Sequence, residues 1–178
     1  MKALAFMETG KVSIIEKPIP DLGPNDAVIK TTAALICTSD VHTVKGVIAI
    51  PPGRVLGHES VGIVYKVGAN VTRCKEGDRV TVCAITPCGH CDNCQRGFTS
   101  QCGGMLGGYK FTTQRDGNMA EYFFVNDADY NLAPTPKSLS DEQALYTTDM
   151  MTTGLAGAEN ANIPPGGTVA VFAQGPVG

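Results

Sequence analysis

The sequence predicts a mainly β protein, built as a barrel or sandwich, that continues into the first strand of an α/β unit. Three observations predict this fold class. Short apolar or alternating runs follow one another at close spacing through most of the chain. Helix signals are few. Near the last residues, a run of the kind buried in parallel sheets leads into a glycine-containing turn.

Six runs predict strands, and β-branched or aromatic residues are frequent in them. They cover residues 3–7, 12–16, 27–34, 63–67, 80–82 and 119–125. Clusters typical of turns separate several of these runs, at 8–11, 22–26, 68–70 and 76–79. Many short strands joined by such turns are expected to form a single barrel or sandwich.

Helices are expected at three places. Residues 39–40 can cap a short helix that runs past His42. Residues 140–143 have the spacing of a capping box, and the helix that they start should run toward Asp149. A third helix is expected within 154–163, because two prolines and two glycines follow it.

The final residues predict the start of a second domain. Residues 168–172 are typical of a buried parallel strand, and they run into the turn at 173–178. A strand that feeds a glycine turn is normally followed by a helix and another strand, in a unit of about 30 residues. The expectation is therefore a chain cut inside, or at the edge of, a second domain.

Composition excludes several classes of protein. The chain has 178 residues, of which 43% are hydrophobic and 17% charged, as is typical of a globular domain. A net charge of −3 gives no basic footprint for nucleic acid. No apolar run is long enough to cross a membrane, and an acid at Glu8 interrupts the first residues too early for a signal peptide. A cytoplasmic protein is expected.

Four of the seven cysteines lie close together and predict a metal site. Cys88, Cys91 and Cys94 follow at intervals of three, and Cys102 comes after a loop. Four thiolates close a tetrahedron around Zn²⁺ and leave no position for substrate, so such a site is structural. Alternatives are an iron–sulfur cluster or buried and redox-active thiols. His90 can replace one cysteine as a ligand, but a solvated loop residue is the favoured interpretation.

A second candidate site is scattered along the chain. Cys37, His58 and Asp149 are all zinc-ligand types, and Glu59 is next to His58. Spacing alone leaves simpler readings open for each of them: a core thiol, a structural histidine, and a capping or surface carboxylate.

Four motifs in this order resemble those of the zinc-dependent medium-chain alcohol dehydrogenases. They are Gly57-His58-Glu59, the segment 37–42, the segment 77–80 and the four-cysteine spacing. Asp149, in the segment 149–154, is similar to the secondary-alcohol and formaldehyde-dehydrogenase-like branch, where an aspartate takes the third ligand position. The resemblance implies a GroES-like catalytic domain, a partly open barrel, over residues 1–150. It implies a truncated Rossmann domain, which binds NAD or NADP, over 151–178.

The resemblance also implies roles for the site residues. Cys37, His58 and Asp149 hold a catalytic zinc, and Glu59 stands behind it or becomes a transient fourth ligand. Zinc acts as a Lewis acid on a small alcohol or carbonyl, and hydride passes to or from NAD(P). Ser39 and His42 carry the alcohol proton to solvent. Asp40 orients a ligand or binds the chain locally.

The expected cofactor turn consists of Gly175, Pro176, Val177 and Gly178, with Ala173 where the usual pattern has a glycine. The full-length form is expected to be a homo-oligomer, either a dimer or a tetramer. Two other hypotheses remain: a non-catalytic module stapled by the four-cysteine zinc, and a quinone-reductase-like relative that has no catalytic zinc. Neither needs the set Cys37, His58 and Asp149.

Overall fold

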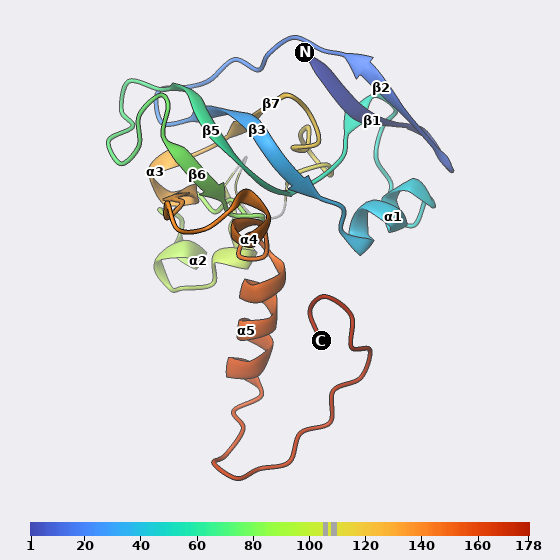
Figure 1. Ribbon diagram of the computed structural model, residues 1–178, viewed down its shortest axis with the longest axis vertical. Coiled ribbons are helices and arrows are strands. Elements are labelled where there is room, and N and C mark those ends of the chain that lie inside the picture. Colours follow the sequence, from blue (N-terminus) through green and yellow to red (C-terminus); the bar gives the residue numbers. More distant parts are fainter. Residues whose placement is uncertain (105–106, 108–109) are drawn as a thin grey trace.

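The computed structural model describes residues 1–104, 107 and 110–178, and the predicted mainly β fold class is confirmed. The strands form two open sheets with the orders β2–β1–β4 and β7–β3–β5–β6–β8, in which all neighbours are antiparallel. The strands are β1 Lys2–Glu8, β2 Lys11–Glu16, β3 Ala27–Leu35, β4 Arg54–Val55, β5 Glu59–Val67, β6 Arg79–Val82, β7 Tyr122–Val125 and β8 Leu132–Pro134. Figure 1 shows both sheets in one body, from which the helix α5 (Met150–Asn160) extends.

The segment before β7 joins the two sheets. The Leu4 N–H donates to the Met119 carbonyl over 2.8 Å, and Ala3 pairs with Ala120 in an isolated bridge. Since β7 itself belongs to the larger sheet, this contact joins β1, the middle strand of the smaller sheet, to the larger sheet. The result is a partly open barrel.

The main hydrophobic core of the described residues packs against the larger sheet. Ile29, Val64, Val80 and Phe123 are each at most 1% exposed, and the Phe123 ring packs edge-on against Phe111 with centroids 6.2 Å apart. Burial of each such side chain stabilises the fold by roughly 1.5–3 kcal/mol. A slip of one residue would turn these side chains to solvent, so the core fixes the register of the strands.

The register of β3 and β5 positions two candidate ligands. The strands pair antiparallel with Leu35 opposite Glu59. Cys37 follows the end of β3 by two residues, and His58 directly precedes β5. The two side chains therefore start from the same end of the β3–β5 pair, although 20 residues lie between them in the sequence.

The first two predicted helices form. α1 (Thr38–Val44) begins after the N-cap Cys37, two residues earlier than the predicted cap. α4 (Asp141–Leu145) has the predicted capping box: the Gln143 N–H donates to Ser140 Oγ over 3.2 Å, and the Ser140 N–H donates to Gln143 Oε1 over 2.9 Å. Three one-turn elements were not predicted: α2 Asp92–Gln95, η1 Thr99–Gln101 and α3 Ala128–Asn131.

The third helix and the residues after it differ from the prediction. α5 starts at its N-cap Asp149, earlier than expected. The predicted strand at 168–172 is wrong for this structure: the segment is irregular, and Phe172 is 90% exposed. A parallel strand requires a neighbour to pair its N–H and C=O groups, and the tail of residues 161–178 lies beside no strand of the described chain. The division into domains at residue 150 stays a prediction.

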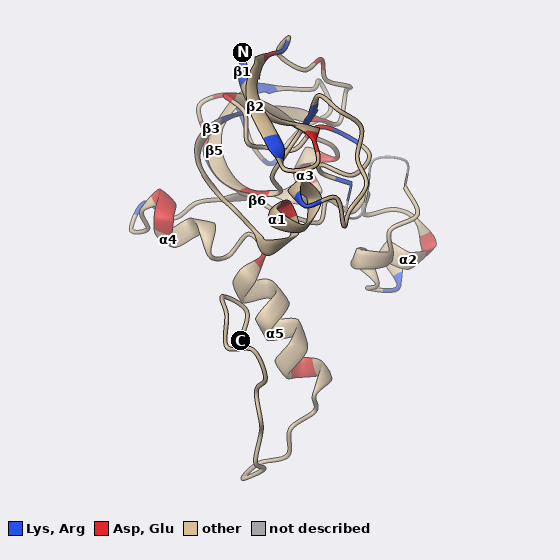
Figure 2. Ribbon diagram, turned by 90° about the vertical axis from the view of Figure 1, so that its right-hand side faces the viewer, with Lys and Arg blue, Asp and Glu red and all other residues tan. Residues whose placement is uncertain are grey.

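Charge is unevenly distributed along the molecule. Acidic and basic side chains are interspersed over the β part, whereas Glu159 is the one charged residue of 150–178 (Figure 2). No helix in the described part of the chain is long and apolar enough to cross a membrane.

Candidate metal centres

The four clustered cysteines converge as predicted. One sulfur from each of Cys88, Cys91, Cys94 and Cys102 lies within 4.8 Å of the other three, and none forms a disulfide. Backbone amides point at these sulfurs, since the Cys88 N–H donates to Cys102 Sγ over 3.3 Å and the Gly104 N–H donates to the same atom over 3.3 Å. Such bonds favour thiolates, the form that binds metal.

The protonation preferences of this cluster fit a cation. Hydrogen bonds from the backbone of Cys94 and Gly103 lower the pKa of Cys91 to about 6. Burial raises the pKa of Cys94 to about 12. A close set of sulfurs that cannot all ionise alone is stabilised by a divalent ion, and four thiols suit Zn²⁺. His90 is exposed, and its Nδ1 lies 2.8 Å from the Cys88 carbonyl, so it is not among the four donors.

Glycine is required at two positions in or next to the cysteine lobe, which is the segment 88–102 that carries the four clustered thiols. A Cβ on Gly107 would lie 2.4 Å from Cys102 Sγ, closer than any real contact. Gly89 has φ of +77° and leaves no room for a side chain beneath the ring of Tyr130. The two glycines therefore allow the backbone to pack closely around the cluster.

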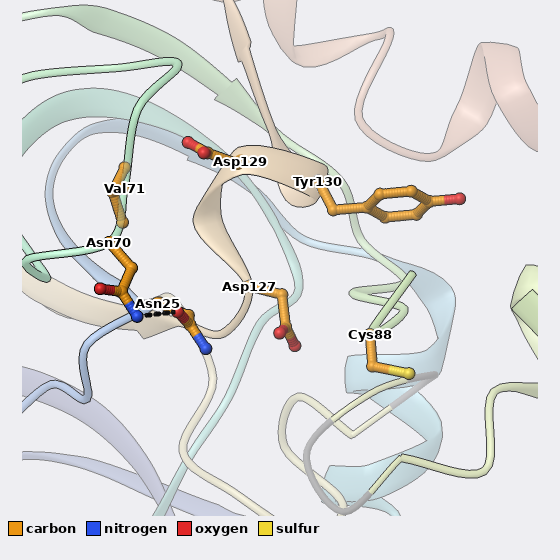
Figure 3. A pocket seen from close by; sticks show the side chains of 7 residues that line it. All are labelled: Asn25, Asn70, Val71, Cys88, Asp127, Asp129 and Tyr130. Carbon is orange, nitrogen blue, oxygen red and sulfur yellow. Dashed lines mark hydrogen bonds between the residues drawn. The ribbon is translucent and has the colours of Figure 1, made fainter. Parts of the chain in front are cut away.

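A cavity of about 210 Å³ reaches Cys88 from the side of α3 (Figure 3). Its polar groups are largely engaged with each other or with the chain. Asn70 donates to Asn25 over 2.9 Å, and Asp129 accepts the Thr72 N–H at 2.9 Å. The ring of Tyr130 extends away from the acids. This cavity is a junction between loops, not a metal site.

The scattered candidates also meet. Cys37, His58, Glu59 and Asp149 each offer one atom within 4.8 Å of the others. His58 and Glu59 are 2% exposed, whereas the Asp149 side chain is 25% exposed and Cys37 is half-buried. The cluster is thus enclosed on the sheet side and open on the side of Cys37 and Asp149. A metal held by three of these groups keeps a position for another molecule.

The electrostatics of this open cluster also fit a cation. Burial lowers the pKa of His58, but the hydrogen bond to Asp149 and the charges of Asp40, Asp149 and Glu59 outweigh it and raise the pKa above its ordinary value. The same hydrogen bond lowers the pKa of Asp149. Burial raises the pKa of Glu59, whose Oε2 has no hydrogen-bond partner within the described chain. Carboxylates gathered round one imidazole, with a buried oxygen unsatisfied, are the donors that a divalent ion would satisfy.

Asp40 connects the two loops that carry ligands. Its carboxylate is 4% exposed and accepts the Cys37 N–H at 2.9 Å and the Gly57 N–H at 3.0 Å. Gly57, with φ of +92°, directly precedes His58. The two expectations for Asp40 are therefore one: the local capping bond is also what holds a ligand loop in place.

Asp149 is held by its own helix. Thr153 Oγ1 donates to Asp149 Oδ1 over 2.5 Å, and the other carboxylate oxygen lies 3.3 Å from His58 Nε2. Thr153 was not among the predicted site residues. A hydroxyl four residues after an aspartate at a helix start is the signal that would have found it.

The remaining predicted site residues are placed less closely. Ser39 is half-buried in the first turn of α1, and His42 is exposed one turn later, so the two share a face of the helix. Gly175 and Gly178, with Pro176 and Val177 between them, are exposed in the tail. The structure does not bring this turn to either cluster, and its role in cofactor binding stays a prediction.

This partly open β domain contains two different clusters of donor groups. One is closed and has four thiols, as is typical of structural zinc sites, and the other is open and has mixed donors, as is typical of catalytic zinc sites. The family model described as the alcohol dehydrogenase GroES-like domain matches residues 23–137. The chain belongs to this family.

Individual relatives agree with that assignment. The chain is 50% identical to the NADP-dependent isopropanol dehydrogenase of Thermoanaerobacter brockii, covering 100% of this chain and 51% of that protein. It is 46% identical to an alcohol dehydrogenase of Cupriavidus necator, covering 100% of this chain and 52% of that protein. The solved structure of the apo zinc-dependent alcohol dehydrogenase 2 of Streptococcus pneumonia superimposes with a TM-score of 0.91 and 36% identity, over 99% of this chain and 50% of that chain. The chain spans about half the length of these relatives.

Proposed function

We propose that this chain is the catalytic half of a zinc- and NAD(P)-dependent alcohol dehydrogenase that interconverts a secondary alcohol and a ketone. The reaction removes a hydride and a proton: alcohol plus NAD(P)⁺ gives ketone, NAD(P)H and H⁺. The observation that carries the proposal is the open cluster of Cys37, His58 and Asp149, which a purely structural domain has no use for. The named activities of the relatives support the same reaction.

Cys37, His58 and Asp149 would hold the catalytic zinc, and Cys88, Cys91, Cys94 and Cys102 the structural one. Bound at the open cluster, zinc supplies Lewis acidity that lowers the pKa of an alcohol hydroxyl. Glu59 offers a buried carboxylate oxygen next to the three ligands, where its negative charge would balance the ion and make it a candidate transient ligand. Asp40 and Thr153 keep the ligand loops and the Asp149 carboxylate in position.

The chain's own residues move the proton. Ser39, two residues beyond Cys37, accepts the proton of the alcohol hydroxyl, and exposed His42 on the same face of α1 passes it to solvent. The nicotinamide cofactor supplies the hydride acceptor when it is bound, and we assign its pyrophosphate to the turn at Gly175–Gly178. This assignment requires residues 168–172 to become a strand beside others that the tail does not contact here.

The wider setting follows the same proposal. The substrate is a small alcohol or carbonyl compound, and the complete enzyme is a cytoplasmic homo-oligomer with no nucleic-acid or membrane partner. The quinone-reductase-like alternative lacks support, because it has no use for the convergence of a thiol, an imidazole and a carboxylate in one open cluster.

The test is alcohol-dependent reduction of NAD⁺ and NADP⁺ by the longest natural form of the protein that contains residues 1–178. Asp149→Ala is expected to abolish turnover of propan-2-ol. Asp129→Ala is the matched control, because Asp129 also lies near the start of a helix and accepts a hydrogen bond, but it belongs to neither cluster. Turnover that survives Asp149→Ala unchanged, or wild-type protein without activity toward any secondary alcohol, would refute the proposal.

A further inference from the structure

Thr112 has a backbone conformation that a threonine rarely adopts. Its φ is +64°, and the Thr113 N–H donates to the Phe111 carbonyl over 2.6 Å, so the chain makes a tight three-residue turn centred on Thr112. Among the non-glycine residues of the described chain that have a positive φ, Thr112 is the only β-branched one. A branched side chain is strained in this region of φ, because its Cβ approaches the carbonyl oxygen that follows. Such a conformation persists only where the surrounding structure imposes it.

The residues on either side of Thr112 impose the turn. The Phe111 ring is fully buried and belongs to the main hydrophobic core. The Arg115 guanidinium lies over the same ring, 4.0 Å from its centroid. The Arg115 N–H also donates to the Lys110 carbonyl over 3.1 Å. Because the turn is anchored at both ends, the position of the Thr112 side chain is fixed as well.

The Thr112 hydroxyl contacts the loop that carries a candidate ligand. Thr112 is 3% exposed, and its Oγ1 donates to the Gly57 carbonyl over 3.2 Å. The Asn118 N–H donates to the same carbonyl oxygen over 3.1 Å. This carbonyl belongs to the peptide group that joins Gly57 to His58, and a peptide group is planar. The two donors therefore fix the plane from which the His58 side chain leaves the backbone.

Thr112 and Asp40 hold opposite sides of Gly57. Asp40 accepts the Gly57 N–H at 3.0 Å, in the peptide group that precedes Gly57, whereas Thr112 acts on the peptide group that follows. Gly57 has a φ of +92°, and a Cβ there would lie 2.6 Å from Met119 Cγ. The position therefore requires glycine, the residue with the most backbone freedom, and hydrogen bonds have to restrict it.

We propose that Thr112 is a positioning residue for the open cluster: its hydroxyl fixes the Gly57–His58 peptide group and so aligns the His58 imidazole with Cys37 and Asp149. This inference rests on the function proposed above, since it concerns the cluster that would hold the catalytic zinc. The proposal also explains why the strain is kept, because a glycine would relieve it but offers no hydroxyl. One neutral hydrogen bond corresponds to roughly a fivefold change in an equilibrium constant.

The test is Co²⁺ competition against a chromophoric chelator, with the longest natural form of the protein that contains residues 1–178 and with the four-cysteine cluster as internal reference. Thr112→Val keeps the branching of the side chain and removes the donor. Its affinity for Co²⁺ at the open cluster should fall roughly fivefold, and the d–d absorption bands of that site should shift. Thr112→Ser keeps the hydroxyl and should restore both the affinity and the bands.

Thr135→Val is the matched control. Thr135 is also buried, and its Oγ1 lies 2.9 Å from Thr81 Oγ1, outside both clusters. The control variant therefore loses a comparable hydrogen bond, and it should bind Co²⁺ at the open cluster as the wild type does.

The outcomes separate this inference from the proposed function. If wild-type protein binds no Co²⁺ at the open cluster, the proposed function fails and this inference with it. If it binds Co²⁺ there and Thr112→Val binds it equally well, the proposed function stands and the role of Thr112 is overturned. A loss in Thr112→Val that Thr112→Ser or Thr135→Val shares in full also overturns it. Should Thr112→Val fail to fold, Thr112→Gly takes its place, because glycine adopts this φ without strain, and wild-type affinity in that variant overturns the role.

Discussion

Replacing Asp40 with alanine tests whether the metal site depends on a clamp behind it. The carboxylate accepts two backbone N–H groups, a partly buried one from Cys37 at 2.9 Å and a buried one from Gly57 at 3.0 Å. Hydrogen bonds to a charged group contribute about 1.5–3 kcal/mol each, and alanine would leave both donors unsatisfied. Part of this free energy is lost from global stability, and part from the alignment of Cys37 with His58.

We therefore expect Asp40→Ala to weaken metal binding at the open cluster by roughly 10- to 100-fold. The assay is stepwise Co²⁺ competition against a chromophoric chelator, in which the four-cysteine site serves as an internal reference. Asp129→Ala is the matched control, because Asp129 also accepts two backbone N–H groups, from Thr72 at 2.9 Å and Arg73 at 2.8 Å. Equal weakening in both variants, or unchanged affinity in Asp40→Ala, would refute the clamp.

Three further predictions concern stability and pH. Hydrogen bonds from Thr32 and Arg79 lower the pKa of Asp141. The stabilising effect of this carboxylate is therefore complete above its unfolded-state pKa and is lost as pH falls through the folded-state value. Asp141→Asn should lower the free energy of unfolding in urea by about 1 kcal/mol at neutral pH and by little at pH 3. Ser140→Ala should cost about 1 kcal/mol in the same assay, because the capping bond to Gln143 is lost. Burial lowers the pKa of His58, but its acidic neighbours outweigh this effect and raise the pKa in the metal-free chain. Because the metal must displace the proton of His58, Co²⁺ affinity at the open cluster should rise with pH until His58 is neutral. A pH-independent affinity would contradict this prediction.

Much of the fold was predictable because its signals are local. Alternation and turn residues identified six strands, and the capping box at 140–143 is present as predicted. β4 and β8 were missed because they have two and three residues, too few to show a period. The strand at 168–172 failed for the opposite reason: its apolar pattern is strong, but a strand exists only with partners.

The two clusters differed in how far the sequence could predict them. Close spacing made the set from Cys88 to Cys102 visible directly. The ligands of the open cluster are brought together by the β3–β5 register and by the start of α5, which no short window of sequence contains. Resemblance to a family supplied that set in advance, and the structure supplied the bonds of Asp40 and Thr153 that position it.

The most direct test of the central claim is zinc content per chain, measured by elemental analysis on purified wild-type protein and on Cys37→Ser. The account predicts two zinc ions in the wild type and one in the variant, with the remaining ion held by the four cysteines of the lobe. One zinc in both proteins would contradict it, because the open cluster would then hold no metal and the chain would contain only a structural site.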